Sequence, residues 1–491
     1  MRSIKTNAVY NSVYQVARLI FPIITYPYVS RILGPSGLGQ VTYAQSIAEY
    51  FAMIALLGLP MYGLREVSRA RNDRGQLSRL FSELLFLSVV FSIVATGVYA
   101  LLHVFSSDLV HSSALYAVFS LSVLFSFSRI DWFFQGMENY SFVTVRSFLI
   151  RLVSAALVFV VVREPQDFLN YGMLWVAGTV LSGIINLTYA RKTVSLQIKG
   201  LKPFRHLRLV LPTVGVQLVG MMYSMIDVLM LGYLVKDDAY SVGLYSVAGR
   251  IMRVILSIVN AGLAVATPRL SNLASNNDQE RSFRLVTKSF SLALFFGLPA
   301  TLGLVITAPQ FVPVFAGHLF TEAIPTAILL APLLLILSLS SVIAFQILYP
   351  QKRERVLIFS SAVSLTVAVL LNLLLIPRYG HVGAAVATLV STSLGLSIQI
   401  VAVWKQTKHC LVNAINGRIC VVVFVWVGIL LLLNQYFGNY GQFVHLLLTT
   451  VSGAVLFGIL SIVFRVSPAL MLFSWFKTAV FRKLRSKDSG D

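Results

Sequence analysis

Residues 243–255 read GLYSVAGRIMRVI, and the chain continues to residue 267 as LSIVNAGLAVAT. A membrane-spanning helix needs about 20 mostly apolar residues, and this stretch meets that length. It nevertheless contains two arginines, Arg250 and Arg253, whose spacing of three places them on one helical face. A charge inside an apolar span is costly, so it usually faces a cavity or a partner. This stretch therefore predicts a fold of membrane-spanning helices with a charged interior.

The composition of the whole chain points to the same class. Of the 491 residues, 57% are hydrophobic and 12% are charged, with a mean hydropathy of +0.81. Soluble domains are usually about one quarter charged. We therefore predict one all-α, polytopic membrane protein. The two cysteines, Cys410 and Cys420, form no pattern that would indicate a disulfide framework or a metal site.

Fourteen segments are long and apolar enough to be predicted as spanning helices. They cover residues 8–33, 40–64, 82–104, 113–135, 142–162, 171–190, 209–234, 243–267, 286–308, 326–349, 356–376, 382–404, 418–436 and 443–464. The connections between them are short. The sequence therefore predicts no large extramembrane domain.

The distribution of basic residues predicts the orientation of these spans. With a cytoplasmic N-terminus, 29 of the 39 lysines and arginines fall on inner segments, four fall on outer loops and six lie inside spans. Cytoplasmic loops of membrane proteins collect Lys and Arg, so both termini are predicted to be cytoplasmic. The net charge of +21 is explained by this topology, and no nucleic-acid partner is predicted.

The two ends of the chain are predicted to lie at the membrane as well. The start, MRSIKTNAVYNSVYQ, lacks the compact apolar core and cleavage site of a signal peptide, so we interpret it as the beginning of the first helix. The last segment, 466–491, is basic and aromatic. We expect it to form an amphipathic helix on the anionic inner leaflet, where membrane lipids are its partners.

An internal repeat organises the spans into two halves. The pattern G-x-x-[S/T]-x-A occurs as Gly39-Thr42-Ala44 and again 204 residues later, beginning at Gly243. An offset of six helices preserves topology, so the repeat is predicted to be parallel, about an axis along the membrane normal. Small residues could also serve helix packing alone. The predicted parts are an N-lobe at 1–190, a basic cytoplasmic linker at 191–208, a C-lobe at 209–404, two additional helices at 405–465 and the tail at 466–491.

Several distinctive motifs are spread in order along the chain. The first is PYVSRILGPSGLGQVTYAQSIAEYF at 27–51. The others are LGLPMYGLREVSRARND (57–73), DWFFQGMENY (131–140), DVLMLG (227–232), VGLYSVAGRI (242–251), TPRLSNL (267–273) and VGAAVATL (382–389). Each motif is weak alone, but together they span nearly the whole chain and resemble the polysaccharide-biosynthesis branch of the MOP exporter superfamily.

The resemblance implies a lipid-linked oligosaccharide flippase of the Wzx type in the bacterial cytoplasmic membrane. It implies two six-helix lobes around a cationic central cavity, working by alternating access. The substrate of such a protein is a glycan linked to undecaprenyl pyrophosphate, as in O-antigen synthesis. A polysaccharide polymerase and chain-length proteins are the expected protein partners.

Arginines inside the spans are the candidate substrate-binding residues, because the planar guanidinium binds phosphate oxygens in pairs and keeps its charge. Arg18 and Arg253 lie roughly 15 Å into their helices at 1.5 Å per residue and are the preferred candidates. Arg250 is shallower and matches Asp227 in depth, so an ion pair between them is the competing interpretation. Glu49, similarly, could pair with Arg18.

Arg129, Arg146 and Arg151 lie nearer the predicted cytoplasmic ends of their spans. Snorkelling towards water is their default explanation, and an entrance patch for the anionic head group is the alternative. Asp131 is predicted to pair with one of them. Asp227 and Glu49 are also candidates for binding a coupling ion, H⁺ or Na⁺, because intramembrane carboxylates often relay ions.

Two other functions compete with the flippase. A multidrug cation exporter of the same superfamily would need an acidic cavity, whereas six in-span arginines here meet three in-span acids. A membrane-embedded glycan polymerase would need a large outer loop with catalytic groups or a metal-binding DxD motif. The largest predicted outer loop, 308–326, has one acid, Glu322, and no DxD motif lies at the end of a predicted span. We therefore predict no enzymatic activity, no catalytic residues and no cofactor.

Overall fold

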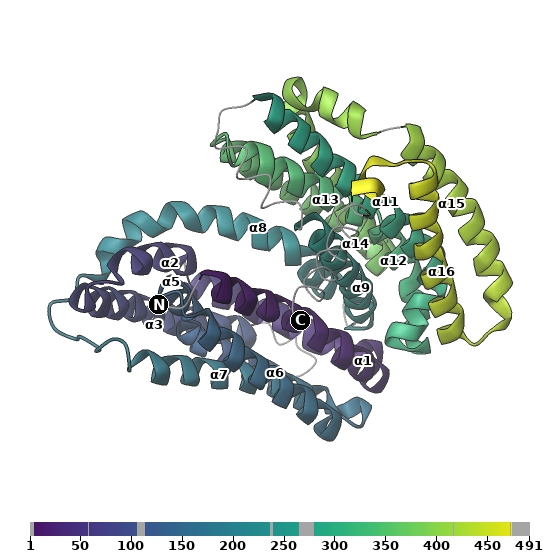
Figure 1. The fold of residues 1–491 in the computed structure, drawn as a ribbon. Helices are drawn as coiled ribbons and strands as arrows, with labels where there is room; N and C mark the ends of the chain where they lie inside the picture. Colours follow the sequence, from purple (N-terminus) through teal and green to yellow (C-terminus); the bar gives the residue numbers. More distant parts are fainter. Residues whose placement is uncertain are drawn as a thin grey trace, which may run out of the picture. The chain divides into compact units, whose positions relative to one another are not determined.

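The computed structural model describes residues 4–471 and 473, apart from 57, 106–112, 236–238, 265–278 and 416. Among the residues described there is no β-strand, which confirms the predicted all-α class. The main helices follow one another along the chain (Figure 1). They are α1 (Ile4–Leu56), α2 (Leu59–Ala70), α3 (Arg74–Phe105), α4 (Ser113–Leu124), α5 (Asp131–Gly136), α6 (Tyr140–Val161), α7 (Phe168–Ala190), α8 (Leu207–Leu234), α9 (Ala239–Ala264), α11 (Gln279–Ala316), α12 (Ile324–Leu330), α13 (Leu333–Ile343), α14 (Glu354–Ala414), α15 (Gly417–Tyr436) and α16 (Gln442–Val463).

Two of these helices are much longer than one span, and each bends at a glycine. α1 breaks at Gly34, which has a φ of 65°, directly before Pro35. α14 breaks at Gly380, which has a φ of 51°. Positive φ is sterically costly for other residues, and proline ends the hydrogen-bonding pattern of a helix. Each break falls between two predicted spans, so α1 and α14 each carry a pair of them.

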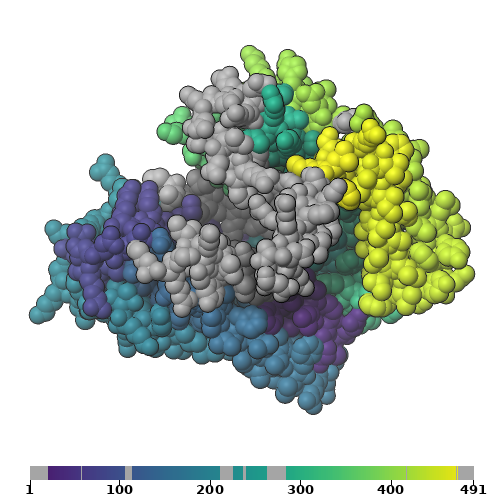
Figure 2. Space-filling model, in the orientation of Figure 1, coloured from purple at the N-terminus to yellow at the C-terminus, as the bar shows by residue number. Residues whose placement is uncertain are grey.

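Ten helices in the described ranges are long and apolar enough to cross a membrane, or eleven if the bent pair of α1 and α2 counts as one span. The protein is therefore a polytopic membrane protein, while the number of fourteen crossings stays a prediction. Large apolar side chains on these helices are widely exposed, including Phe424 at 82% and Leu432 at 68%. Both residues lie on α15, which packs with α16 along one side of the C-terminal part of the chain (Figure 2). Such faces suit contact with lipid.

The helices form two compact units. The first unit contains residues 1–246 and 368–384, and the second contains residues 247–367 and 385–491. In the first unit, one core cluster joins α1, α3, α4 and α7 around Phe119, and another joins α2, α3 and α5 around Phe133. In the second unit, Phe290 of α11 packs within a cluster that also includes α13, α14, α15 and α16. The predicted division into six-helix lobes stays a prediction.

The glycines of the sequence repeat lie against each other within the first unit. A Cβ added to Gly39 would collide with the carbonyl group of Ala239, and one added to Gly243 would collide with the carbonyl group of Pro35. Gly39 and Gly243 are 204 residues apart from each other, and Pro35 and Ala239 are separated by the same number of residues. Each half of the repeat thus contributes the same surface to one contact, as at a two-fold interface. Small residues here allow the backbones of α1 and α9 to approach closely.

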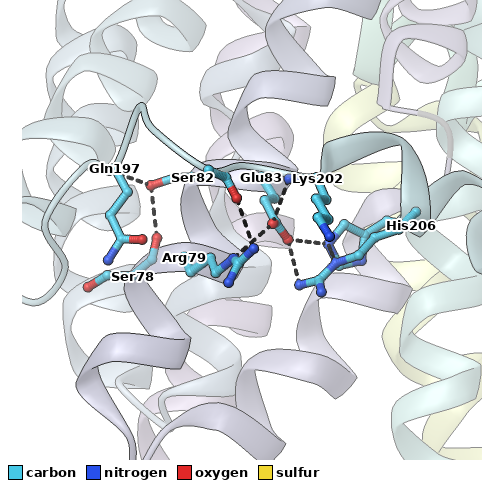
Figure 3. Close-up of polar contacts among 9 residues, drawn as sticks. Ser78, Arg79, Ser82, Glu83, Gln197, Lys202 and His206 are labelled. Carbon is cyan, nitrogen blue, oxygen red and sulfur yellow. Dashed lines mark hydrogen bonds and ion pairs between the residues drawn. The ribbon is translucent and has the colours of Figure 1, made fainter.

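The segment predicted as a basic linker is anchored on the first turns of α3 (Figure 3). Glu83, whose side chain is fully buried, accepts hydrogen bonds from the Lys202 backbone amide at 2.9 Å and from Arg205 Nη2 at 2.7 Å. His206 Nε2 lies 2.8 Å from the same carboxylate, and its Nδ1 lies 2.7 Å from the Tyr62 hydroxyl. Ser78 and Ser82 accept further backbone bonds from the linker. A buried carboxylate is stable only when paired and bonded in this way.

Candidate functional site

The first charged pair in the apolar interior joins α1 to the segment that follows α4. Arg129 Nη1 donates to Glu49 Oε2 at 2.8 Å, and Arg129 Nη2 donates to Glu49 Oε1 at 3.1 Å. The two parallel hydrogen bonds make this a bidentate ion pair, the strongest form of such a contact. Arg129 ends the short 3-10 turn η2 (Phe125–Ser128), where the helical pattern between α4 and α5 is interrupted. The sequence had offered Arg18 as a possible partner of Glu49, and the structure pairs Glu49 with Arg129.

A second buried network surrounds Arg146 of α6. Its guanidinium donates to both carboxylate oxygens of Asp131, at 2.8 and 3.2 Å, and also to Asn186 Oδ1. Asn186 Nδ2 in turn donates to Asp131 Oδ1 at 3.0 Å and to the Ser128 carbonyl at 3.3 Å. This network links α5, α6 and α7 through groups that satisfy one another's hydrogen bonds. The prediction that Asp131 pairs with a nearby arginine is confirmed.

The predicted snorkelling of Arg146 towards water is wrong. Only 4% of its side chain is exposed, because Asp131 and Asn186 compensate its charge inside the helix bundle. Arg129 is 27% exposed and is also paired, so snorkelling does not describe it well either. Arg151 lies on the same helix as Arg146 and is half-buried. The proposed role of these three arginines in capturing a head group stays a prediction.

A third polar cluster in the first unit is centred on Asp227 of α8. Its Oδ2 accepts a hydrogen bond from the Tyr245 hydroxyl at 2.9 Å, and its Oδ1 accepts one from Asn372 Nδ2 at 2.8 Å. All three side chains are buried. Within the described part of the chain, the carbonyl oxygen Oδ1 of Asn372 has no hydrogen-bond partner. Three helices therefore bring a carboxylate, a hydroxyl and an available amide oxygen together.

The remaining predicted residues are distributed over both units. Arg253 is exposed on α9 and its guanidinium lies near Gly249, one turn earlier, while Arg250 is half-buried. The predicted pair of Arg250 with Asp227 would bridge the two units and stays a prediction. Arg18 lies on α1, but its side chain is outside the described part of the structure. The roles of Arg18 and Arg253 in binding substrate also remain predictions.

Asn186 and Asn372 are two polar residues of these networks that the sequence analysis did not single out. Each is a single amide in an apolar run, SGIINLTY at 182–189 and LLNLLLIP at 370–377. A lone amide in a spanning helix usually bonds across to a neighbouring helix. The two lone asparagines can be seen in the sequence, but the sequence does not identify the residues that they bond.

The described helices and their buried ion pairs belong to a polytopic membrane fold, and solved structures share that fold. An inward closed conformation of the lipid II flippase MurJ superposes with a TM-score of 0.75 at 16% sequence identity, covering 93% of this chain and 99% of that one. An inward-facing MATE family multidrug resistance transporter superposes with a TM-score of 0.57 at 12% identity, covering 82% and 98%. At these identities the likeness concerns the fold.

Sequence comparison gives the family. Residues 4–274 match the family described as polysaccharide biosynthesis protein, and the chain belongs to that family. A candidate O-antigen transporter of Escherichia coli K12 is 23% identical over 412 residues, covering 82% of this chain and 97% of that protein. A candidate flippase of Haloferax volcanii, AglR, is 25% identical over 247 residues, covering 48% and 50%. The resemblance noted in the motifs is thus confirmed.

Proposed function

We propose that this protein is a flippase that moves an undecaprenyl-pyrophosphate-linked oligosaccharide from the cytoplasmic to the outer leaflet by alternating access. Its family and the relatives described as O-antigen transporters support transport of a lipid-linked glycan. A polysaccharide polymerase and chain-length proteins would then act on the exported glycan at the outer face. These steps place the protein between synthesis of the repeat unit and its assembly into a polymer.

The charge balance inside the spans carries the proposal for an anionic head group. Glu49 and Asp131 are taken up by Arg129 and Arg146. Beyond these pairs, the predicted spans hold four more candidate arginines and two more acids, Asp227 and Glu83, and Glu83 pairs with Arg205 of the linker. The interior is therefore net positive, and a pyrophosphate, with about two negative charges, suits such a site. A cationic drug would be repelled by it, which disfavours the multidrug exporter.

The test is substitution of the two preferred arginines in a strain that displays the surface glycan. Arg18→Ala and Arg253→Ala are each expected to reduce export at least tenfold, because a bidentate phosphate contact is lost. Arg18→Lys and Arg253→Lys should restore export in part, since lysine keeps the charge but not the planar fork. The measurement is surface glycan by immunoblot, beside accumulation of the lipid-linked intermediate by mass spectrometry.

Matched controls separate a binding role from misfolding. Arg378→Ala removes an exposed basic residue outside the predicted cavity and should leave export unchanged. Membrane levels of every variant are compared by immunoblot. Normal export by both alanine variants would exclude these arginines as the anion site, whereas the mass of the lipid-linked intermediate that accumulates in a deletion strain would still report the substrate.

We propose further that Asp227, Asn372 and Tyr245 bind the coupling ion, and that this ion is Na⁺. A hard cation prefers oxygen ligands, and the cluster offers a carboxylate together with the Asn372 Oδ1 that lacks another partner in the described residues. Transporters commonly place such ion sites within the bilayer, on helices from different parts of the chain. The proton is the alternative ligand, bound by Asp227 itself.

Thermal stability in Na⁺ and in K⁺ distinguishes these ions. For the purified wild type, saturating Na⁺ at about 100 times its dissociation constant should stabilise the protein by about 2.7 kcal/mol relative to K⁺. Asn372→Ala and Asp227→Asn should remove the difference between the two salts. If the melting temperature is the same in both salts but varies with pH in a manner that Asp227→Asn abolishes, the proton is the coupling ion.

A further inference from the structure

An apolar groove lies between the two halves of α14, on the part of that helix that belongs to the second unit. Its volume is about 580 Å³, which is in the usual range for pockets that hold small molecules. The apolar lining includes Val356, Phe359, Leu394, Ile398 and Val401. Arg355 is the one charged residue in the lining. The groove therefore combines a long apolar surface with a single positive charge.

Hydrogen bonds and close packing hold the two walls of the groove in place. Arg353 Nη2 donates to the Ala402 carbonyl at 3.1 Å, which ties the beginning of α14 to its second half. Further along, Gln399 Nε2 donates to Ser360 Oγ at 3.2 Å. A Cβ on Gly395 would collide with the Ser364 hydroxyl, so the helices are in direct contact there. The two halves of α14 are therefore held together near Arg355 by a hydrogen bond and near Leu394 by close packing.

The side chains that line the groove are exposed, unlike those of a buried pocket. Phe359 is 62% exposed and Val401 is 74% exposed. Arg355 is exposed as well, and it forms no hydrogen bond or ion pair with any residue that the structure describes. Apolar walls that are this open are expected to face lipid in a spanning protein.

The basic charge is confined to one end of the groove. Lys352, Arg353 and Glu354 precede Arg355, so a connection predicted to be cytoplasmic carries three basic residues and one acidic residue. The cytoplasmic leaflet is rich in anionic lipids, which attract lysine and arginine near the membrane surface. An amphiphile with one anionic head and an apolar chain matches both the charge and the apolar lining.

We propose that this groove binds an anionic glycerophospholipid of the cytoplasmic leaflet. One acyl chain lies along the groove between the halves of α14, and the phosphate contacts the Arg355 guanidinium. A helix from a second copy would fill the apolar walls but would leave the arginine without an anion. None of the residues that line the groove is an arginine proposed to bind substrate, so the proposal stands whether or not the protein transports a pyrophosphate-linked glycan.

Native mass spectrometry of the full-length protein tests the proposal. The protein is purified in detergent micelles that contain equal amounts of phosphatidylglycerol and phosphatidylethanolamine. The wild type should retain phosphatidylglycerol preferentially, and Arg355→Gln should lower the ratio of the two retained lipids about fivefold, the effect of one basic side chain near an anionic surface. Val401→Trp should reduce retention of both lipids by filling the groove. Arg378→Gln, at the other end of the first half of α14, should leave the ratio unchanged.

Several outcomes would reject the proposal. One is an unchanged lipid ratio in Arg355→Gln, and another is an equal fall in Arg378→Gln. Unchanged lipid retention in Val401→Trp would place the chain elsewhere. Undecaprenyl phosphate, added at the same concentration, should not displace phosphatidylglycerol; complete displacement would assign the groove to the substrate chain. A dimer that carries no lipid would assign it to a second copy.

Discussion

Arginines in the first unit that pair with a carboxylate have a structural role, which distinguishes them from arginines that are candidates for binding substrate. Arg129 and Arg146 each bind a carboxylate with two hydrogen bonds. Removing one partner from a buried pair leaves an uncompensated charge, which is more destabilising than losing the pair as a whole. Their substitution would therefore impair folding before it tested transport.

The Glu49–Arg129 pair gives a prediction at the scale of single residues. Glu49→Gln and Arg129→Gln should each destabilise the protein by about 2 kcal/mol, while the double variant should lose less than the sum, because it leaves no unpaired charge. The charge-reversed variant Glu49→Arg with Arg129→Glu should recover part of the stability. Thermal unfolding of the purified protein measures each value. Strict additivity of the two single substitutions would show that the contact contributes nothing.

Helices depend on small residues where the two copies of the repeat meet. At Gly39 and Gly243 the backbones of α1 and α9 are so close that a methyl group has no room. The kink at Gly34 and Pro35 directs the second part of α1 into this contact. A similar glycine break divides α14 at Gly380, where an added Cβ would still be 3.5 Å from the Ser241 hydroxyl. A break at a glycine with positive φ therefore occurs in both of the long helices, α1 and α14.

Alanine substitution tests the contact between α1 and α9. Gly243→Ala should destabilise the protein by about 1–3 kcal/mol, since the new methyl group forces the two backbones apart. Gly428→Ala on α15 is the matched control, because no atom lies within 4 Å of the position of its added Cβ. It should leave stability unchanged or raise it by up to about 1 kcal/mol through helix propensity. Equal effects of both substitutions on the melting temperature would contradict the close approach.

At the scale of the whole molecule, the anchored linker and the charge distribution bear on orientation in the membrane. Residues 191–206 are held on the beginning of α3 by Glu83, Ser78 and Ser82 (Figure 3). The predicted inner segments carry 29 of the 39 basic residues, and this linker is one of the richest. The positive-inside rule then predicts that the linker and both termini face the cytoplasm.

Single-cysteine labelling measures this orientation directly. Cys410 and Cys420 are replaced by serine, and a cysteine is introduced at Lys199 or at Gln166, both of which are exposed. An impermeant maleimide added to intact cells should label Gln166→Cys but not Lys199→Cys, and disrupted membranes should allow both to react. Labelling of Lys199→Cys in intact cells would reverse the predicted topology.

The sequence by itself determined the class and the family, and it predicted where the apolar helices lie. Lipid cannot satisfy backbone hydrogen bonds, so every apolar run of sufficient length must form a helix, and this can be counted residue by residue. The breaks at Gly34 and Gly380 could also be placed, since they fall between predicted spans. The ordered motifs from residue 27 onwards identified the family because they need only local order along the chain.

Only the tertiary structure decided which polar groups meet. Glu49 and Arg129 are 80 residues apart, and Asp227 and Asn372 are 145 residues apart. Depth along a helix, which the sequence provides, allows several partners for one carboxylate, as the choice between Arg18 and Arg129 shows. The partner is fixed by the rotation of each helix and by the packing of its neighbours, and these depend on close contacts such as that of Gly39 with Ala239.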